Sequence, residues 1–120
     1  MGRLIAAHLA RQNLPVSHRF ELDSYHAIMA MVAAGLGWTI LTPLGFLHAH
    51  RFREAADVLP LPFRPLTRTI SLTARRGVLQ DMPADVAARL RLLVQDLIVA
   101  PGLERMPWLD GTLRVLGPER

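Results

Sequence analysis

The chain has 120 residues, no cysteine and a formal net charge of +4 at pH 7, and 51% of its residues are hydrophobic. This length corresponds to one domain or less, and the apolar content is sufficient for a buried core. The lack of cysteine excludes a disulfide scaffold and thiolate metal sites, and it fits a cytoplasmic protein. All basic residues are arginines and they are scattered, so the charge is no indication of nucleic acid binding.

The first part of the chain predicts one helix and one short strand. Residues 1–13 follow the amphipathic pattern of a helix, with Leu4, Ile5 and Leu9 on its inward side and His8 as a further candidate there. Residues 17–22 alternate between apolar and charged side chains near their end, which predicts a strand that turns Phe20 to one face.

The middle of the chain combines helix caps, glycines and an uncharged apolar run. Asp23 and Ser24 are good N-cap residues, because a short side-chain oxygen can accept a hydrogen bond from an amide of the first turn. The apolar run 25–34 predicts a buried helix, and Gly35 can close it in the left-handed conformation. The β-branched and aromatic residues 38–42 predict a strand directly afterwards.

A second helix is predicted after this strand. Pro43 ends the strand and suits the first turn of a helix, for which Thr42 is the cap. Residues 44–56 continue that helix with a weak pattern, and the prolines within residues 58–65 force an extended connector.

A membrane-spanning helix is the alternative interpretation of the same stretch. Residues 27–47 carry no formal charge, and a bilayer requires roughly 20 apolar residues. Glycines and a proline interrupt the run, however, and this favours separate pieces of a globular α/β domain.

Residues 68–74 have the clearest strand pattern, because Ile70, Leu72 and Ala74 alternate with hydroxyl side chains. After a turn at residues 75–77, a long helix is predicted to open near Asp81.

The spacing of the long helix predicts one buried stripe, which consists of Val86, Leu90, Leu93 and Leu97. Pro101 and Gly102 are expected to end the helix. The tail 103–120 fits either a short strand or loose packing.

Several of these segments together resemble the effector-binding domain of LysR-type transcriptional regulators. The resemblance lies in Glu21-Leu22-Asp23-Ser24, in the helix end Val32-Ala33-Ala34-Gly35-Leu36-Gly37, and in the short strand that ends at Pro43. The order of the later elements also fits, and the likeness covers residues 1–99. It implies an α/β fold that is part of a periplasmic-binding-protein-like (type 2) two-lobed domain, with a mixed sheet and flanking helices.

The resemblance also implies a domain layout and partners. Residues 1–42 are expected to belong to the second lobe, residues 43–100 to return into the first lobe, and residues 101–120 to form a tail of uncertain structure. A homo-oligomer is expected. DNA would be contacted only through a helix-turn-helix domain absent from this chain, and no membrane is involved.

A small effector binds between the lobes in the family that the chain resembles, and this implies a set of site residues. Ser24 is the candidate hydrogen-bond donor, Phe20 an apolar wall and Thr42 a second hydroxyl. The positive end of a helix attracts anions, so an anionic metabolite is expected, and Asp23 would compete with it. Structural roles stay open, since Ser24 and Thr42 can be caps only and Phe20 can be core only.

Motifs of catalysis, cofactors and metals are missing from the sequence, which has no G-x-S-x-G, no H-E-x-x-H and no glycine-rich phosphate loop. His48 and His50 would diverge on a helix, so no metal site is predicted. The sequence therefore predicts a ligand-sensing fragment with no catalytic residue and no cofactor. A fragment of a solute-binding protein and a small membrane-associated protein are the alternatives.

Overall fold

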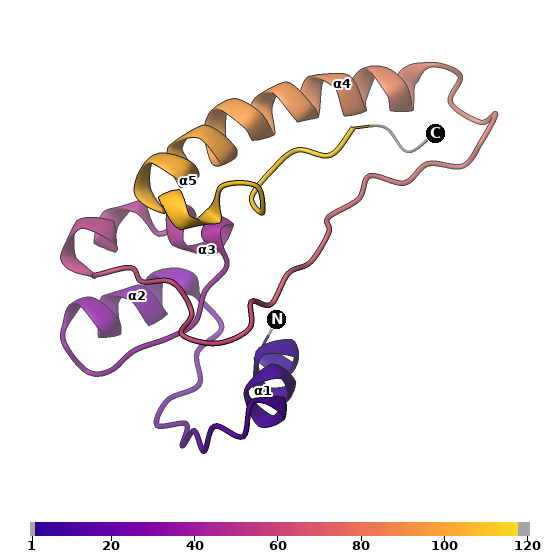
Figure 1. Ribbon diagram of the computed structural model, residues 1–120. Coiled ribbons are helices and arrows are strands. Elements are labelled where there is room, and N and C mark those ends of the chain that lie inside the picture. Colours follow the sequence, from indigo (N-terminus) through magenta and orange to yellow (C-terminus); the bar gives the residue numbers. More distant parts are fainter. Residues whose placement is uncertain (1, 118–120) are drawn as a thin grey trace. The chain divides into compact units, whose positions relative to one another are not determined.

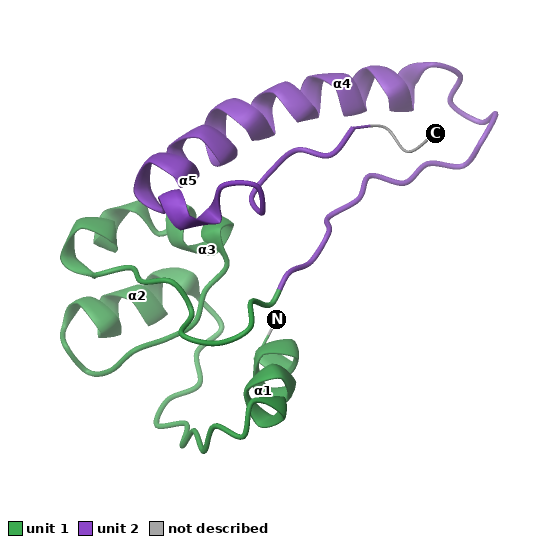
Figure 2. Cartoon of the chain, in the orientation of Figure 1, with its two compact units in different colours: residues 1–66 green, residues 67–120 purple. Residues whose placement is uncertain are grey.

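The structure is a computed structural model that describes residues 2–117, and the chain divides into two compact units, residues 1–66 and residues 67–120 (Figure 2). The first unit contains the helices α1 (Gly2–Arg11), α2 (Tyr25–Ala33) and α3 (Pro43–His48) and the 3-10 helix η1 (His50–Ala55). The second contains α4 (Met82–Val94), the π-helical turn η2 (Gln95–Val99), α5 (Ala100–Arg105) and the 3-10 turn η3 (Pro107–Leu109) (Figure 1).

The expectation of a mixed sheet was wrong, because residues 2–117 contain helices and irregular segments and no strand. The predicted strands 17–22, 38–42 and 68–74 all lack regular structure. An extended segment becomes a strand only when a neighbouring segment supplies hydrogen-bond partners for its backbone. The local patterns were those of strands, but no described segment pairs with them. The α/β fold class and the type 2 two-lobed arrangement are therefore not found in this structure.

The start and the end of helix α2 were predicted correctly. It begins directly after Ser24, whose side chain accepts a hydrogen bond from the amide of Ala27, and Ala34 is its C-cap. Gly35 follows with a φ of 75°, the left-handed conformation that a helix stop requires. The next helix, α3, starts only at Pro43. The uncharged run 27–47 is thus broken into two helices with an irregular segment between them.

The core of the first unit lies where α2 packs on α3 and η1. Met29 of α2, Phe46 of α3 and Ala49 between α3 and η1 are all buried, with exposed fractions of 3%, 5% and 0%. Because three short helices share this small core, none of them buries a long apolar stripe.

The C-terminal half of α1 packs against the rest of the first unit. His8 and Leu9 are buried, whereas Leu4 is 52% exposed, so Leu4 does not lie on the inward side as the pattern predicted. Nε2 of His8 donates a hydrogen bond to the carbonyl oxygen of Arg64 at 2.7 Å. The ring of His8 also contacts that of Phe63, with 5.8 Å between the centroids. A buried histidine thus connects α1 to the proline-containing connector.

The long C-terminal helix differs from its prediction in two ways. The predicted buried stripe is exposed, with exposed fractions from 41% to 67% at Val86, Leu90, Leu93 and Leu97. The helix also continues past Pro101, because the wider turn η2 precedes α5 and the amide of Ala100 bonds to the carbonyl of Gln95. A π-turn shifts the hydrogen-bonding register, and a proline fits at the first turn of the segment that follows.

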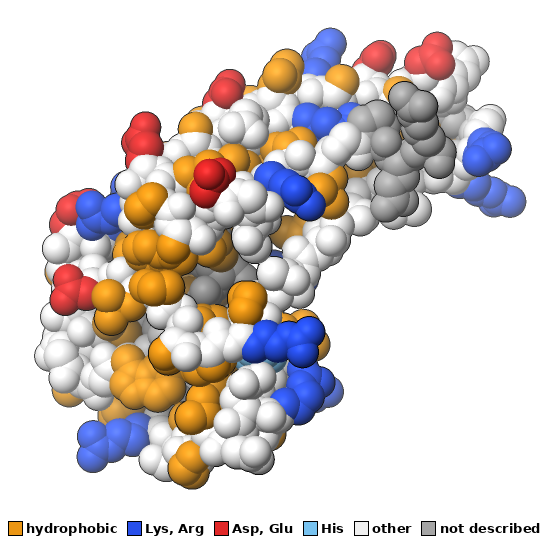
Figure 3. Space-filling view, in the orientation of Figure 1, with side chains coloured by type: hydrophobic (Ala, Val, Ile, Leu, Met, Phe, Trp, Pro, Cys, Tyr) orange, Lys and Arg blue, Asp and Glu red, His pale blue; other side chains and the backbone are white. Residues whose placement is uncertain are grey.

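Large hydrophobic side chains are exposed in both units, and Figure 3 shows many of them at the surface. They include Phe20, Trp38 and Leu59 in the first unit and Ile70, Leu92 and Leu97 in the second. Monomeric domains seldom expose this much apolar surface, so parts of it are candidate interaction surfaces. None of the helices in residues 2–117 has the length and apolar character needed to cross a bilayer.

Candidate functional site

Ser24 stands at the start of α2 with extended backbone angles, φ −111° and ψ 126°. Its Oγ lies 3.4 Å from the amide nitrogen of Ala27 and accepts a hydrogen bond from it. A hydroxyl that accepts in this way still has its own proton to donate. The side chain is exposed. Ser24 can therefore cap the helix and donate to a ligand at the same time.

Thr42 has the same role at the start of α3. Its Oγ1 accepts a hydrogen bond from the amide of Gly45 at 3.1 Å, and Pro43 occupies the first turn. The sequence-based prediction of this cap is confirmed, and the side chain is half-buried.

The two capped helix starts are linked by one aromatic ring. A methyl group built on Gly45 would lie 2.9 Å from Cε1 of Tyr25 and 3.2 Å from Oγ1 of Thr42. Tyr25 is the first residue of α2 and follows Ser24 directly. The ring of Tyr25 therefore packs on the first turn of α3, and the structure brings the starts of α2 and α3 into one region of the first unit.

Phe20 and Asp23 precede α2 and are both exposed. Phe20 has an exposed fraction of 60%, which rules out the structural alternative of a core residue within the described chain. Asp23 directly precedes the cap residue Ser24, and the first turn of α2 itself contains no acid. The negative charge of Asp23 partly neutralises the positive end of the helix dipole. It thereby weakens the attraction of that end for an anionic ligand.

Three histidines come together in the same unit, which sequence reasoning missed. The ring centroid of His26 lies 5.2 Å from that of His48 and 6.4 Å from that of His50, both in edge-to-face arrangements. His26 belongs to the first turn of α2, two residues after Ser24. Only the packing of α2 on the following helices creates this proximity, so no local signal was present. Within residues 2–117, no group of three or more His, Asp or Glu side chains is arranged to hold a metal ion.

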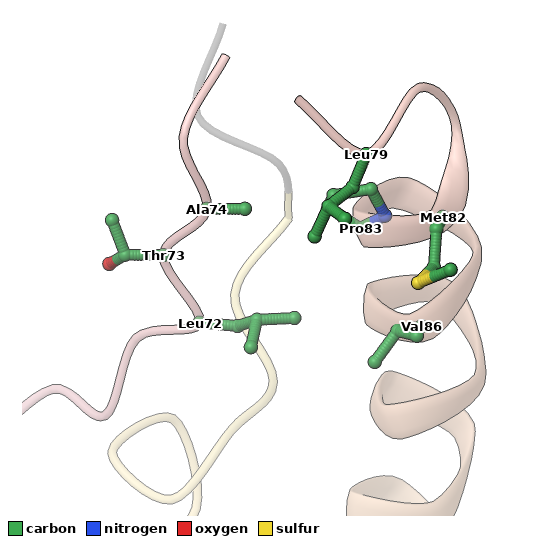
Figure 4. Close-up of a pocket in the computed structure, with 7 residues that line it drawn as sticks. All are labelled: Leu72, Thr73, Ala74, Leu79, Met82, Pro83 and Val86. Atoms are coloured by element: carbon green, nitrogen blue, oxygen red, sulfur yellow. The ribbon is translucent and has the colours of Figure 1, made fainter. Parts of the chain in front are cut away.

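Two shallow cavities lie away from these residues. One, of about 150 Å³, is in the first unit near the end of α1, and is lined by Ala6, Leu9, Ala10, Leu14, Val16 and His18. The other, of about 180 Å³, is in the second unit between residues 72–74 and the start of α4 (Figure 4). Neither of these two cavities is lined by Phe20, Asp23, Ser24 or Thr42, and Ser24 itself is exposed.

Comparison with known proteins gives one match. A protein-family model described as the LysR substrate binding domain matches residues 1–97 of the chain. The matched range includes Phe20, Asp23, Ser24 and Thr42. No curated protein and no solved structure gives a match.

Proposed function

The chain belongs to the LysR substrate-binding domain family, and from this premise we propose that it is the effector-sensing part of a LysR-type transcriptional regulator. The observation that carries the proposal is the family match over residues 1–97. The function is to bind a small molecule and thereby alter transcription. DNA is contacted by a separate helix-turn-helix domain, and the regulator works as a homo-oligomer in the cytoplasm.

The proposed effector is a small anionic metabolite that binds at the start of α2. The amides of the first turn and the helix dipole make this end positive. The hydroxyl of Ser24 is exposed there and has a proton to donate. The absence of acids from the first turn of α2 supports the same ligand class. A carboxylate group would accept from Ser24 and lie at the positive end of the helix.

Phe20 and Thr42 complete the proposed site. Phe20 is 60% exposed shortly before α2, where an apolar ligand body can cover its ring. Thr42 presents a second hydroxyl at the start of α3, and the ring of Tyr25 holds that helix start against α2. The ligand class that fits is therefore a carboxylic acid with an apolar portion and a further polar group.

Calorimetric titration of the chain with a panel of mono- and dicarboxylic acids tests this proposal. Loss of one hydrogen bond to a charged group is worth about 1.5–3 kcal/mol, so Ser24→Ala is expected to weaken binding at least tenfold. Because Ser24→Ala also removes a helix cap, Ser24→Gly is the sharper variant. Glycine preserves most of the capping preference and lacks the hydroxyl.

The control is Ser17→Ala, which removes an exposed hydroxyl outside the site. Ser17→Ala is expected to bind the acid with unchanged affinity, whereas Ser24→Gly is expected to bind it more weakly. Unchanged affinity in Ser24→Gly would show that the hydroxyl is no ligand donor.

A further inference from the structure

Two histidines from different helices lie next to each other in the first unit. The ring centroid of His26, in the first turn of α2, is 5.2 Å from that of His48, the last residue of α3, and the ring planes are 77° apart. The sequence analysis considered only His48 and His50, which diverge. The structure pairs His48 with a histidine of another helix instead.

We propose that His26 and His48 bind one zinc ion, each through one ring nitrogen, and that water fills the remaining positions of the ion. Neutral imidazole is a common metal ligand, and it suits zinc, copper and nickel. The site has two protein ligands, since no larger group of His, Asp or Glu side chains in residues 2–117 is arranged to hold an ion. The inference does not rest on the effector site at Ser24, so either proposal can fail while the other stands.

The distance between the two rings fits a shared ion. A zinc–nitrogen bond is about 2.0–2.1 Å long, which places the ion about 3.2 Å from the centre of the ring that binds it. Two such rings at the tetrahedral angle have centres about 5.2 Å apart, and this equals the observed distance. The angle between the planes is compatible, because each ring can rotate about its metal–nitrogen bond. His48 is exposed and His26 is half-buried, so both rings are accessible to an ion from solvent.

The packing of α2 on α3 holds the two histidines at this spacing. The ring of Tyr25 packs on Gly45 of α3. His26 directly follows Tyr25, and His48 lies three residues after Gly45, on the same side of the helix. The contact between α2 and α3 belongs to the core of the first unit. The backbone on both sides of the proposed site is therefore fixed before an ion binds.

His50 lies beside the pair without being a ligand in this proposal. Its ring centroid is 6.4 Å from that of His26, which would require the two nitrogens to lie on opposite sides of a single ion. Nδ1 of His50 also donates a hydrogen bond to the carbonyl oxygen of His48, at 3.3 Å. His50 is thus a suitable control, as a histidine close to the site that the proposed geometry does not use.

Calorimetric titration of the full chain with zinc chloride tests the site, and one zinc ion per chain is expected to bind. His26→Gln and His48→Gln should each weaken binding at least tenfold, since even the loss of a group that only orients a metal ligand costs about 10–100-fold in affinity. His50→Gln and His18→Gln should leave the affinity unchanged. Circular dichroism of each variant checks that its helices are retained.

Two further measurements locate the ion. In NMR spectra, zinc is expected to shift the ring proton signals of His26 and His48 and to leave those of His18 in place. Zinc should also raise the melting temperature of the unmodified chain, because it binds the two rings only where folding brings them together. The melting temperature of His48→Gln should not respond to zinc.

Two outcomes would overturn the proposal. The absence of saturable binding up to about 1 mM zinc, a concentration that fills even a weak specific site, would exclude the site. An equal loss of affinity in His26→Gln, His50→Gln and His18→Gln would show that zinc associates with scattered surface histidines and not with the pair.

Discussion

The imidazole Nε2 of His8 lies 2.7 Å from the backbone carbonyl oxygen of Arg64, so one hydrogen bond joins residues 56 positions apart. A carbonyl oxygen can only accept, which means that Nε2 carries the proton. His8 is 7% exposed, so a polar side chain is buried at this contact. This contact connects α1 to the connector that ends the first unit.

Replacement of His8 by leucine is expected to lower the free energy of unfolding by about 1–3 kcal/mol, because the carbonyl of Arg64 loses its donor in a partly buried position. Urea denaturation measures the change. The control is His18→Leu, at an exposed histidine. His8→Gln, which retains a donor, should recover part of the loss. Equal stability of the His8 and His18 variants would mean that the bond does not contribute.

A side chain at Gly45 would meet crowded surroundings. An added methyl group would lie 2.9 Å from the ring of Tyr25 and 3.2 Å from Oγ1 of Thr42. Gly45→Ala is therefore expected to destabilise the chain by about 1–3 kcal/mol through overpacking. Thermal unfolding followed by circular dichroism measures this, with Gly117→Ala as the control because a methyl group there meets nothing within 4 Å. Similar melting temperatures for the two variants would contradict the packing of Tyr25 on α3.

Asp23 places a negative charge beside the proposed anion site. Asp23→Asn removes that charge and leaves Ser24 as the cap, so affinity for an anionic effector is expected to rise about threefold to tenfold, the scale of a charge effect at a helix end. Glu21→Gln is the matched control, since it removes a charge that lies further from the helix start. The gain should shrink at high salt. Weaker binding in Asp23→Asn would identify Asp23 as a ligand contact instead.

The helix caps of the first unit were predictable because their physics is local. Ser24 and Thr42 each bond to an amide three residues later, so the whole interaction lies within one short segment of sequence. Gly35 likewise takes the left-handed conformation that its position predicts. The family resemblance was also carried by these local segments, and the family match confirms it.

The sheet was predicted wrongly because strands depend on non-local partners. The alternation in residues 68–74 describes which side chains can lie on one face, and it contains no information on whether a neighbouring strand is present. Pro101 was misjudged for a related reason, since the π-turn before it changes the hydrogen bonds that a proline would disrupt. The proximity of His26 to His48 arises only when α2 packs on α3.

The division into residues 1–42, 43–100 and 101–120 stays a prediction, as do the roles of Phe20, Asp23, Ser24 and Thr42 in ligand binding. Each of these roles requires a ligand to be present, and each can be measured at the level of single residues.

Backbone amide NMR during titration with the tightest acid of the calorimetric panel tests the central claim most directly. The account predicts saturable chemical shift changes at the amides of residues 24–27 and 42–45, the two capped helix starts, and their loss in Ser24→Gly. Changes confined to residues 72–86, or no change at saturating acid, would contradict an effector site at the start of α2.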